Sequence, residues 1–156
     1  MAEYSNNALQ TVNPGETIIF TEAPVPCRRG LVRHRDDTGN FLLKGYVPRQ
    51  FGCCPCRRPD SANYLIDFGA NIAIPTGGTV GAISVAITID GATIPASTMT
   101  VTPADVEQFI NVSRAINASV WAGCCETIAV RNTSDQPILV QNANIIISRP
   151  DLAVSR

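Results

Sequence analysis

Charged and aromatic side chains are scarce in this chain of 156 residues. Charged residues make up 16% of it and aromatic residues 6%, whereas hydrophobic residues make up 45%. An intrinsically disordered chain needs high charge and low hydrophobicity, so this composition excludes one. No apolar run approaches the roughly 20 residues that span a bilayer, and we expect no membrane contact. The net charge of −1 gives no general attraction to nucleic acid.

The residues that most enzyme chemistry requires are also missing. His34 is the only histidine, so a serine or cysteine nucleophile has little choice of base. The strings HRD at 34–36 and DFG at 67–69 imitate kinase triplets, but the glycine-rich phosphate loop and the lysine strand of a kinase are absent upstream. We therefore expect no enzyme and no catalytic residue. His34 is either a metal ligand or general base, or a hydrogen-bonded hairpin residue.

Alternation of apolar and polar residues dominates what the sequence does contain. In residues 82–90 the isoleucines and valine fall on one side and small or polar residues on the other, which is typical of a strand. Asp90-Gly91 follows and is typical of a two-residue hairpin turn. We expect further short strands, with a hairpin between 30–35 and 41–46, at 17–21, 64–68, 72–74, 99–101, 110–120, 127–132 and 138–148. Strands at this spacing predict an all-β jelly-roll sandwich.

One stretch has a helical signature. Thr102 offers an N-cap hydroxyl, Pro103 takes the first helical position and Asp105 the third, so we expect at most one short helix near 103–109. The whole chain, 1–156, is predicted to be a single domain. We divide it into an N-terminal arm and first strand (1–26), a basic cysteine-containing hairpin and loop region (27–60), and the main strands (61–149).

The last predicted strand has apolar residues on both of its faces. Leu139, Val140, Ile145, Ile146 and Ile147 are too many for one side of a regular strand. A sandwich on its own normally carries polar residues on its outer face. Subunit packing against a second copy explains the pattern, and so do bulges that shift the register within one chain.

Basic residues concentrate in one part of the chain. Eight of the twelve lie between Cys27 and Arg58, where Asp36 and Asp37 are the only acids. This split predicts either a docking surface for an acidic partner or a neighbouring copy, or solvated loop arginines. The residues of the docking surface would be Arg28, Arg29, Arg33, Arg35, Arg57 and Arg58.

The cysteines allow three interpretations. Disulfides within or between subunits would involve Cys27, Cys53, Cys54, Cys56, Cys124 and Cys125. A zinc ion, the only cofactor we consider, would take ligands from Cys53, Cys54, Cys56 and either Cys27 or His34. The third interpretation is free, partly buried thiols. The pattern lacks the two CxxC pairs of a typical zinc site, and adjacent cysteines rarely bridge each other.

The C-terminal half carries a family resemblance. The strings NIAIPTGGTV (71–80), IDGATIP (89–95), ETIAVRNTS (126–134) and ANIIISR (143–149) resemble the trimeric TNF/C1q-like jelly rolls of bacterial collagen-like spore-surface proteins. The chain is also similar, over nearly its whole length, to small uncharacterised proteins of Firmicutes genomes and prophages. This resemblance implies a compact homotrimer with a structural or adhesive role. The chain departs from the collagen-like proteins in having no Gly-X-Y stalk and in its six cysteines.

These observations lead to one expected function and two alternatives. The polar residues 1–10 hold no apolar signal-peptide core, which favours assembly in the cytoplasm and release by lysis. We expect a non-enzymatic homotrimeric subunit on a phage virion surface, either a capsid decoration or a head or tail appendage, in contact with a capsid protein. The first alternative is a carbohydrate-binding or host-attachment module, in which Tyr4, Tyr46, Tyr64 or Trp121 stacks on sugars. The second is a spore- or cell-surface appendage subunit cross-linked by cysteines.

Overall fold

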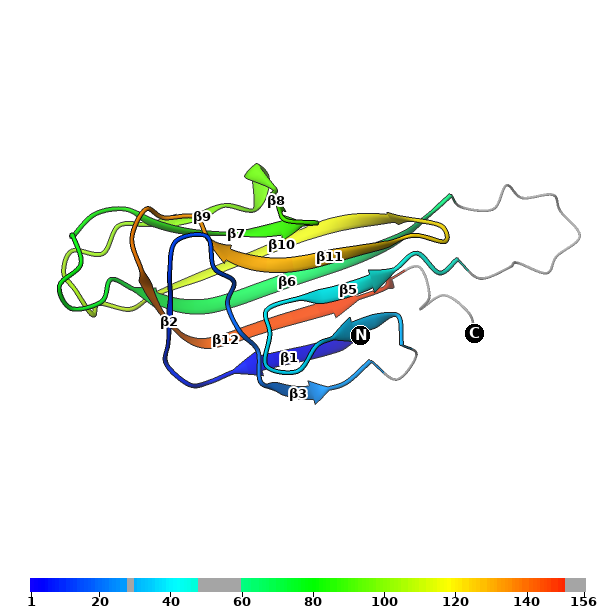
Figure 1. Ribbon diagram of the computed structural model, residues 1–156, viewed down its shortest axis with the longest axis horizontal. Coiled ribbons are helices and arrows are strands. Elements are labelled where there is room, and N and C mark those ends of the chain that lie inside the picture. Colours follow the sequence, from blue (N-terminus) through cyan, green and yellow to red (C-terminus); the bar gives the residue numbers. More distant parts are fainter. Residues whose placement is uncertain (28–29, 48–59, 151–156) are drawn as a thin grey trace, which may run out of the picture.

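The fold is a sandwich of two antiparallel sheets (Figure 1) in a computed structural model that describes residues 1–27, 30–47 and 60–150. The first sheet contains, in spatial order, β10 (Ile110–Trp121), β6 (Ser61–Ala73), β12 (Ile138–Ser148), β1 (Ala2–Asn6) and β3 (Glu22–Val25), with β2 (Gln10–Val12) also paired to β12. The second contains β4 (Val32–His34), β5 (Phe41–Lys44), β11 (Cys125–Asn132), β7 (Ile83–Ile89) and β8 (Ala92–Thr93), with β9 (Met99–Val101) also paired to β7.

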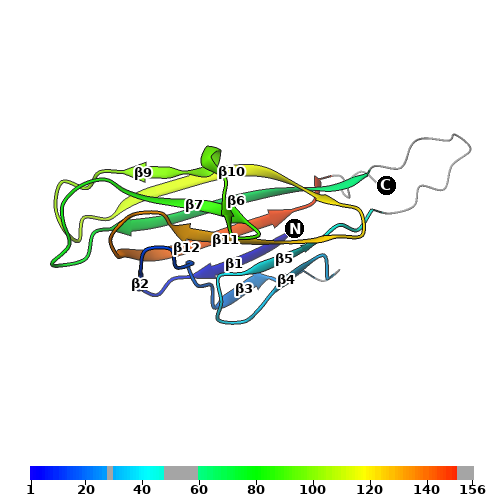
Figure 2. The same cartoon turned by 45° about the horizontal axis from the view of Figure 1, so that its top comes forward.

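The chain passes repeatedly from one sheet to the other. It crosses after β3, β5, β6, β9, β10 and β11, so that sequence neighbours such as β10 and β11 lie in different layers (Figure 2). These crossovers give a jelly roll, and the predicted all-β class is confirmed. Within the described ranges, no helix has the length and apolar character needed to cross a membrane.

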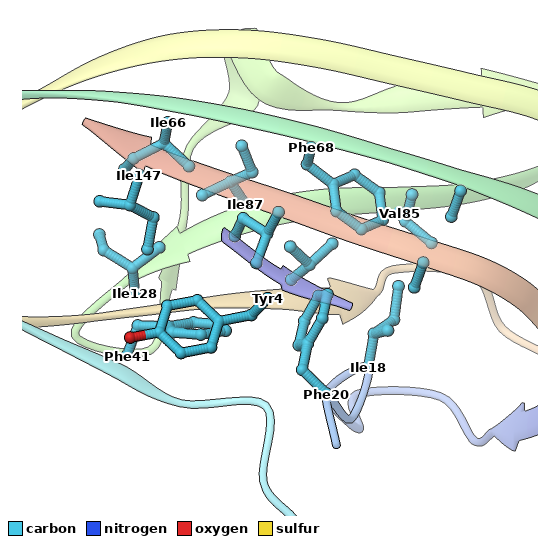
Figure 3. Close-up of a cluster of buried hydrophobic side chains, with 14 of the residues drawn as sticks. Tyr4, Ile18, Phe20, Phe41, Ile66, Phe68, Val85, Ile87, Ile128 and Ile147 are labelled. Carbon is cyan, nitrogen blue, oxygen red and sulfur yellow. The ribbon is translucent and has the colours of Figure 1, made fainter. Parts of the chain in front are cut away.

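Alternation along the strands builds the core between the sheets. Tyr64, Ile66 and Phe68 of β6 are buried while their odd-numbered neighbours point away. Phe20 and Phe41 from the opposite side complete an aromatic cluster, with ring centroids 5.3 Å apart (Figure 3). Burying each such side chain contributes roughly 1.5–3 kcal/mol relative to leaving it in water, so this shared interior is what holds the two sheets together.

Two predicted hairpins are confirmed. β4 and β5 pair across the turn at 35–40, with Val32 opposite Leu43. β7 and β8 pair across Asp90 and Gly91, whose φ angles are +48° and +82°. Positive φ at both central positions is what the type I′ turn requires, so the Asp-Gly signal predicted this turn for the correct physical reason.

The helix predicted near 103–109 is wrong. The segment forms bends and a turn, and Glu107 has a φ of +58°, which a right-handed helix cannot contain. The amide of Glu107 donates to the carbonyl of Ile74 at 2.7 Å instead of to a carbonyl four residues earlier. The Gln108 side chain accepts from the amide of Ala104. A single 3₁₀ turn, Pro95–Ser97, is found nearby.

The strand predicted at 17–21 is reduced to two isolated bridges. Thr17 pairs with Arg131 and Phe20 with Thr38, without a continuous ladder. Ile18 and Phe20 are nevertheless fully buried. The alternation therefore identified core side chains correctly, but the backbone of this segment bridges between partners instead of lying along one strand.

A bulge explains much of the doubled apolar pattern in β12. Asn142 has a φ of +53°, and the pairing of β12 with β6 shifts register between Gln141 and Asn144. Val140 before the bulge and Ile145 and Ile147 after it consequently all face the core. At the same point the other neighbour of β12 changes from β2 to β1.

Candidate functional site

The first sheet presents an unusual outer face to the surroundings. Because even-numbered positions of β6 and β10 point into the core, odd-numbered ones point outward, and the bulge in β12 sets its own outward positions. We call the following residues the outer face: Ser61, Asn63, Leu65, Asp67, Gly69, Asn71, Asn111, Ser113, Ala115, Asn117, Ser119, Trp121, Leu139, Gln141, Asn144, Ile146 and Ser148.

Small neutral side chains make up most of the outer face on β6, β10 and β12, and Asp67 is its only charged residue, with Glu3 of neighbouring β1 opposite Ile146 at its margin. Asn111 donates from its side-chain amide to that of Asn71 at 3.1 Å, and Ser119 donates to the Asn63 side chain. These bonds tie β10 to β6 across the surface. Asparagine and serine also suit a solvated sheet, but the near-absence of charge matches the centres of protein interfaces, which are depleted of charged residues. The outer face therefore has the composition of an association surface.

Asp67 lies at the middle of β6 with neutral neighbours on both sides. It is paired directly with Ala115 on β10 and with Ile146 on β12. Beyond Ile146, Glu3 of β1 is held by the Asn144 side-chain amide at 2.8 Å. Within the described parts of the chain, the Asp67 carboxylate has no hydrogen-bond or ion-pair partner. The DFG string at 67–69 is thus the middle of a strand, with Phe68 buried in the core.

β10 is the edge strand beside this face. Among the described residues its 12-residue backbone pairs with β6 alone. Arg114 interrupts the apolar series on its inner side, because it reaches over the rim of the sandwich to the second sheet. Its Nε and Nη2 both donate to the carbonyl of Ala96, at 3.1 and 2.8 Å. Arg114 is the only charged side chain of β10, and a long edge strand with so little charge tends to pair with another chain.

The aromatic residues divide between core and surface. Tyr4 and Tyr64 are buried, as expected for lone aromatics in a sandwich, and neither is accessible to a sugar. Tyr46 is 56% exposed and Trp121 is 65% exposed. Both belong to the end of the sandwich where Gly45 packs against the backbone of Trp121. Trp121 thus forms the end of the outer face.

Three of the six cysteines lie in the described residues, and no disulfide joins them. Cys124 lies in the turn between β10 and β11, Cys125 is the first residue of β11, and both are exposed. The amide of Gly45 donates to the carbonyl of Cys124 at 2.8 Å, which fixes the turn against the end of β5. Cys27 is half-buried and packs against the core. Cys53, Cys54 and Cys56 lie outside the described residues, so disulfides involving them stay a prediction.

His34 is a hydrogen-bonded residue of the β4–β5 hairpin. Its Nε2 lies 2.8 Å from the carbonyl oxygen of Thr38, and its ring stacks on Phe41 with centroids 4.6 Å apart. No group of three metal-ligating side chains is found in the described ranges, and His34 and Cys27 are not brought into one. A zinc site built on the cysteines at 53–56 lies outside these ranges and stays a prediction.

The predicted basic docking surface is only partly placed. Arg33 and Arg35 are exposed, Arg33 on β4 and Arg35 in the turn that follows. Arg28, Arg29, Arg57 and Arg58 lie outside the described residues. The two placed arginines belong to the β4–β5 hairpin of the second sheet, so they do not contribute to the outer face of the first.

One pair of carboxylates was not indicated by the sequence. Burial raises the pKa of Glu126 above its usual value, and the negative charge of nearby Asp90 raises it further. Asp90 itself accepts from the amide of Thr127 at 2.7 Å. The two acids are 36 positions apart in the chain and become neighbours only because β11 pairs with β7. Nothing in their spacing could have predicted this.

Solved structures with a similar fold are found although the sequences differ widely. The structure resembles the globular domain of zebrafish complement 1qA protein with a TM-score of 0.53 and 10% identity, covering 93% of this chain and 94% of that one. It resembles Eiger TNF from S. frugiperda with a TM-score of 0.60 and 13% identity, covering 95% and 90%. The structure also resembles a family 35 carbohydrate-binding module from an environmental isolate, with a TM-score of 0.40, 13% identity and coverage of 96% and 94%. A likeness this loose supports no conclusion about the chain.

These comparisons establish the fold. No protein-family model and no curated protein matches the sequence. The chain has the jelly-roll fold of C1q and TNF domains, as the resemblance predicted, and identities this low show the fold alone. The relation to bacterial spore-surface proteins stays a prediction.

Proposed function

We propose that this chain is a non-enzymatic structural subunit that associates with copies of itself through the outer face, as a homotrimer. The charge-poor composition of that face carries the proposal. Along β6, β10 and β12 the outward positions hold asparagine, serine, alanine and apolar residues with a single charged side chain, and the centres of protein interfaces are likewise depleted of charge. Burying such a surface removes apolar area from water and desolvates a single charge.

We expect the assembly to be a closed ring, because the edge of β10 is exposed. An uncovered strand such as β10 leads to open-ended association unless the contact closes on itself. Rings of identical copies close when each subunit is rotated by a fixed fraction of a turn. The resemblance to TNF/C1q-like jelly rolls supports three copies as the number in the ring.

A matched pair of substitutions tests this use of the outer face. Ala115→Glu places a carboxylate at the centre of the outer face, and Ala92→Glu places one on exposed β8 of the second sheet. Because a buried carboxylate without a partner is costly, we expect Ala115→Glu to weaken association at least about tenfold in light scattering after gel filtration, while Ala92→Glu leaves it unchanged. Equal behaviour of the two variants would count against the outer face.

We place the assembled subunit on the surface of a phage particle. The similarity to small prophage-encoded proteins supports this setting, and the fold and association surface suit a capsid decoration or appendage. Peptide mass spectrometry of particles purified after prophage induction should detect the chain in stoichiometric amounts. Its absence from particles together with its presence in spore or cell-surface extracts would favour the appendage alternative instead.

Carbohydrate binding is a second candidate, favoured by the exposed indole of Trp121. Exposed aromatic rings stack on the apolar faces of sugars, and Trp121 has the hydroxyls of Ser61 and Ser119 on neighbouring outward positions. A glycan array probed with the native chain and with Trp121→Ala separates the candidates. Binding that disappears in the variant supports an attachment module, whereas no binding by the native chain removes this candidate.

A further inference from the structure

The three longest strands contain two charged residues, and these have opposite signs. β6, β10 and β12 span 13, 12 and 11 residues. Asp67 is the only charge on β6, Arg114 is the only one on β10, and β12 has none. Once association buries these strands, each of the two charges needs a partner, because an unpaired buried charge is costly.

Asp67 and Arg114 cannot pair with each other within one chain. In the register of the sheet Asp67 lies opposite Ala115, while Arg114 lies opposite Phe68, so the two charged side chains leave opposite faces. Asp67 points out from the outer face. Arg114 is on the inner side, where it crosses the rim and donates to Ala96.

Each of the two side chains keeps capacity for an ionic contact. Neither has an ion-pair partner within the described residues, and Arg114 is exposed, with its Nη1 not used in the contact to Ala96. The rim that carries Arg114 is also the uncovered edge of β10. An approaching copy therefore meets this arginine at the edge and the Asp67 carboxylate on the face.

Other described bases suit Asp67 less well. Arg131 donates to the carbonyl of Gly91 and its Nε is buried. Arg149 is buried over the Tyr64 ring. Arg33, Arg35 and Lys44 belong to the β4–β5 hairpin of the second sheet. Arg114 alone combines exposure with a position beside the low-charge strands.

We propose that in the self-association described above, Arg114 at the β10 edge of one copy pairs with Asp67 on the outer face of the next. The contact joins two different surface patches, edge to face, and is therefore heterologous. Heterologous contacts generate a ring when the rotation between copies closes, whereas a twofold contact would place a patch against itself. The inference rests on the proposed self-association and names the ionic pair that sets the register of the contact.

Charge reversal tests the pair. Asp67→Lys and Arg114→Glu each place like charges together, so we expect each to raise the concentration at which the oligomer half-dissociates by about tenfold or more. The double variant Asp67→Lys/Arg114→Glu restores opposite charges in exchanged positions and should return this concentration to within a few-fold of the native value. Asp36→Lys and Arg35→Glu change exposed charges on the β4–β5 turn and should leave it unaltered.

The outcomes separate this inference from the proposal on which it rests. A native oligomer whose double variant associates no better than the weaker single variant would overturn the Asp67–Arg114 pair and leave self-association standing. Loss on Arg35→Glu with none on Arg114→Glu would move the contact to the β4–β5 hairpin. A native chain that never associates would remove both proposals.

A second variant protects the test from a folding defect. Arg114→Glu also gives up the contact to Ala96, so its melting temperature is measured alongside. Asp67→Asn removes only the charge, from a side chain with no partner within the described residues. It should weaken association at low salt and lose most of the salt dependence of the native chain, since ionic contacts are screened by salt. Unchanged salt dependence would contradict the pair.

Discussion

Individual residues at the end of the sandwich fix how its two sheets are joined. A Cβ added to Gly45 would fall on the carbonyl oxygen of Trp121, close to the backbone of Cys124. Glycine is therefore needed at this close approach of two backbones, where the β10–β11 turn rests on the end of β5.

Gly45→Ala should destabilise the fold by about 2 kcal/mol or more, because backbone atoms on both sides would have to move. Gly81 supplies the matched control, since a Cβ there meets nothing within 4 Å and its φ is not positive. Gly81→Ala should be neutral or stabilising by up to about 1 kcal/mol. Urea unfolding of both variants measures the difference, and equal stabilities would show that the close approach at Gly45 is not maintained.

Tyr64 is a second residue that ties the core to this end. Its hydroxyl lies 2.6 Å from the carbonyl oxygen of Lys44 and 3.2 Å from that of Leu31, and the Arg149 guanidinium is 5.0 Å from its ring centroid. Burial raises the pKa of Tyr64 above its ordinary value of 10.0, and the hydrogen bond and charge of Arg149 offset part of that rise.

Alkaline pH should therefore weaken the fold through Tyr64. The unfolded chain loses this proton near pH 10.0, while the folded chain holds it to higher pH. Above that pH the unfolded state binds fewer protons, so the free energy of unfolding falls as pH rises and is unaffected by this group below it. Tyr64→Phe should be less stable by about 1 kcal/mol near neutral pH but lose less stability on going to alkaline pH. Unfolding curves at both pH values would refute this if the two chains lost equal stability.

At the scale of elements, β12 shows where sequence periodicity reaches its limit. Alternation predicted β7 and β10 well, because each keeps one face toward the core along its length, whereas β6 joins the two strands predicted at 64–68 and 72–74 into one. In β12 the positive φ of Asn142 moves the inward series from even to odd numbers. By sequence alone, two apolar half-strands that are out of phase look the same as one strand with two buried faces. The bulge accounts for Val140, Ile145 and Ile147, while Leu139 and Ile146 do point outward, as the subunit-packing interpretation expects.

The bulge makes a prediction about Asn142. Asparagine tolerates left-handed backbone, whereas a β-branched residue does not. Asn142→Val should therefore lower the free energy of unfolding by about 1–2 kcal/mol, while Asn142→Gly should change it by less than about 0.5 kcal/mol. Thermal unfolding of the two variants provides the comparison. A valine variant as stable as the glycine variant would place the bulge elsewhere.

The turn between β10 and β11 is the element on which the cysteine interpretations can be examined. Cys124 and Cys125 are exposed and unbridged in the structure. With the chain kept reduced, both should react with a maleimide in the folded state and appear as two added masses on the peptide that contains them. Protection of either thiol under these conditions, relieved by denaturation, would show that the turn is covered.

Two examples show that local sequence suggests a structure but does not determine long-range contacts: the helix signal at 102–105, and the charged residues Asp67 and Arg114. A threonine, a proline and an acid suit a helix start, but the Ile74 carbonyl competes for the amide of Glu107 from 33 positions away. Arg114 breaks the alternation of apolar and polar residues in the sequence of β10. That it reaches Ala96, and that Asp67 leaves the opposite face of the same sheet, depends on the pairing of β10 with β6.

The whole molecule is a sandwich whose two outer surfaces differ in chemistry. The β4–β5 hairpin of the second sheet exposes arginines, whereas the three long strands of the first expose almost no charge. The jelly-roll class and the core-facing residues of β6, β7 and β10 could be predicted from the strand pattern, whereas the strands β1, β2 and β3 were not predicted. The outer face could not, because it combines single positions from three strands that lie up to 87 residues apart in the chain, from Ser61 to Ser148.

Sedimentation equilibrium of the native chain, from nanomolar to tens of micromolar, tests self-association most directly. The account predicts a mass of three times the 16.6 kDa of one chain at the upper concentrations, with dissociation on dilution. A mass of 16.6 kDa throughout that range would contradict it and leave the charge-poor outer face without the role assigned to it.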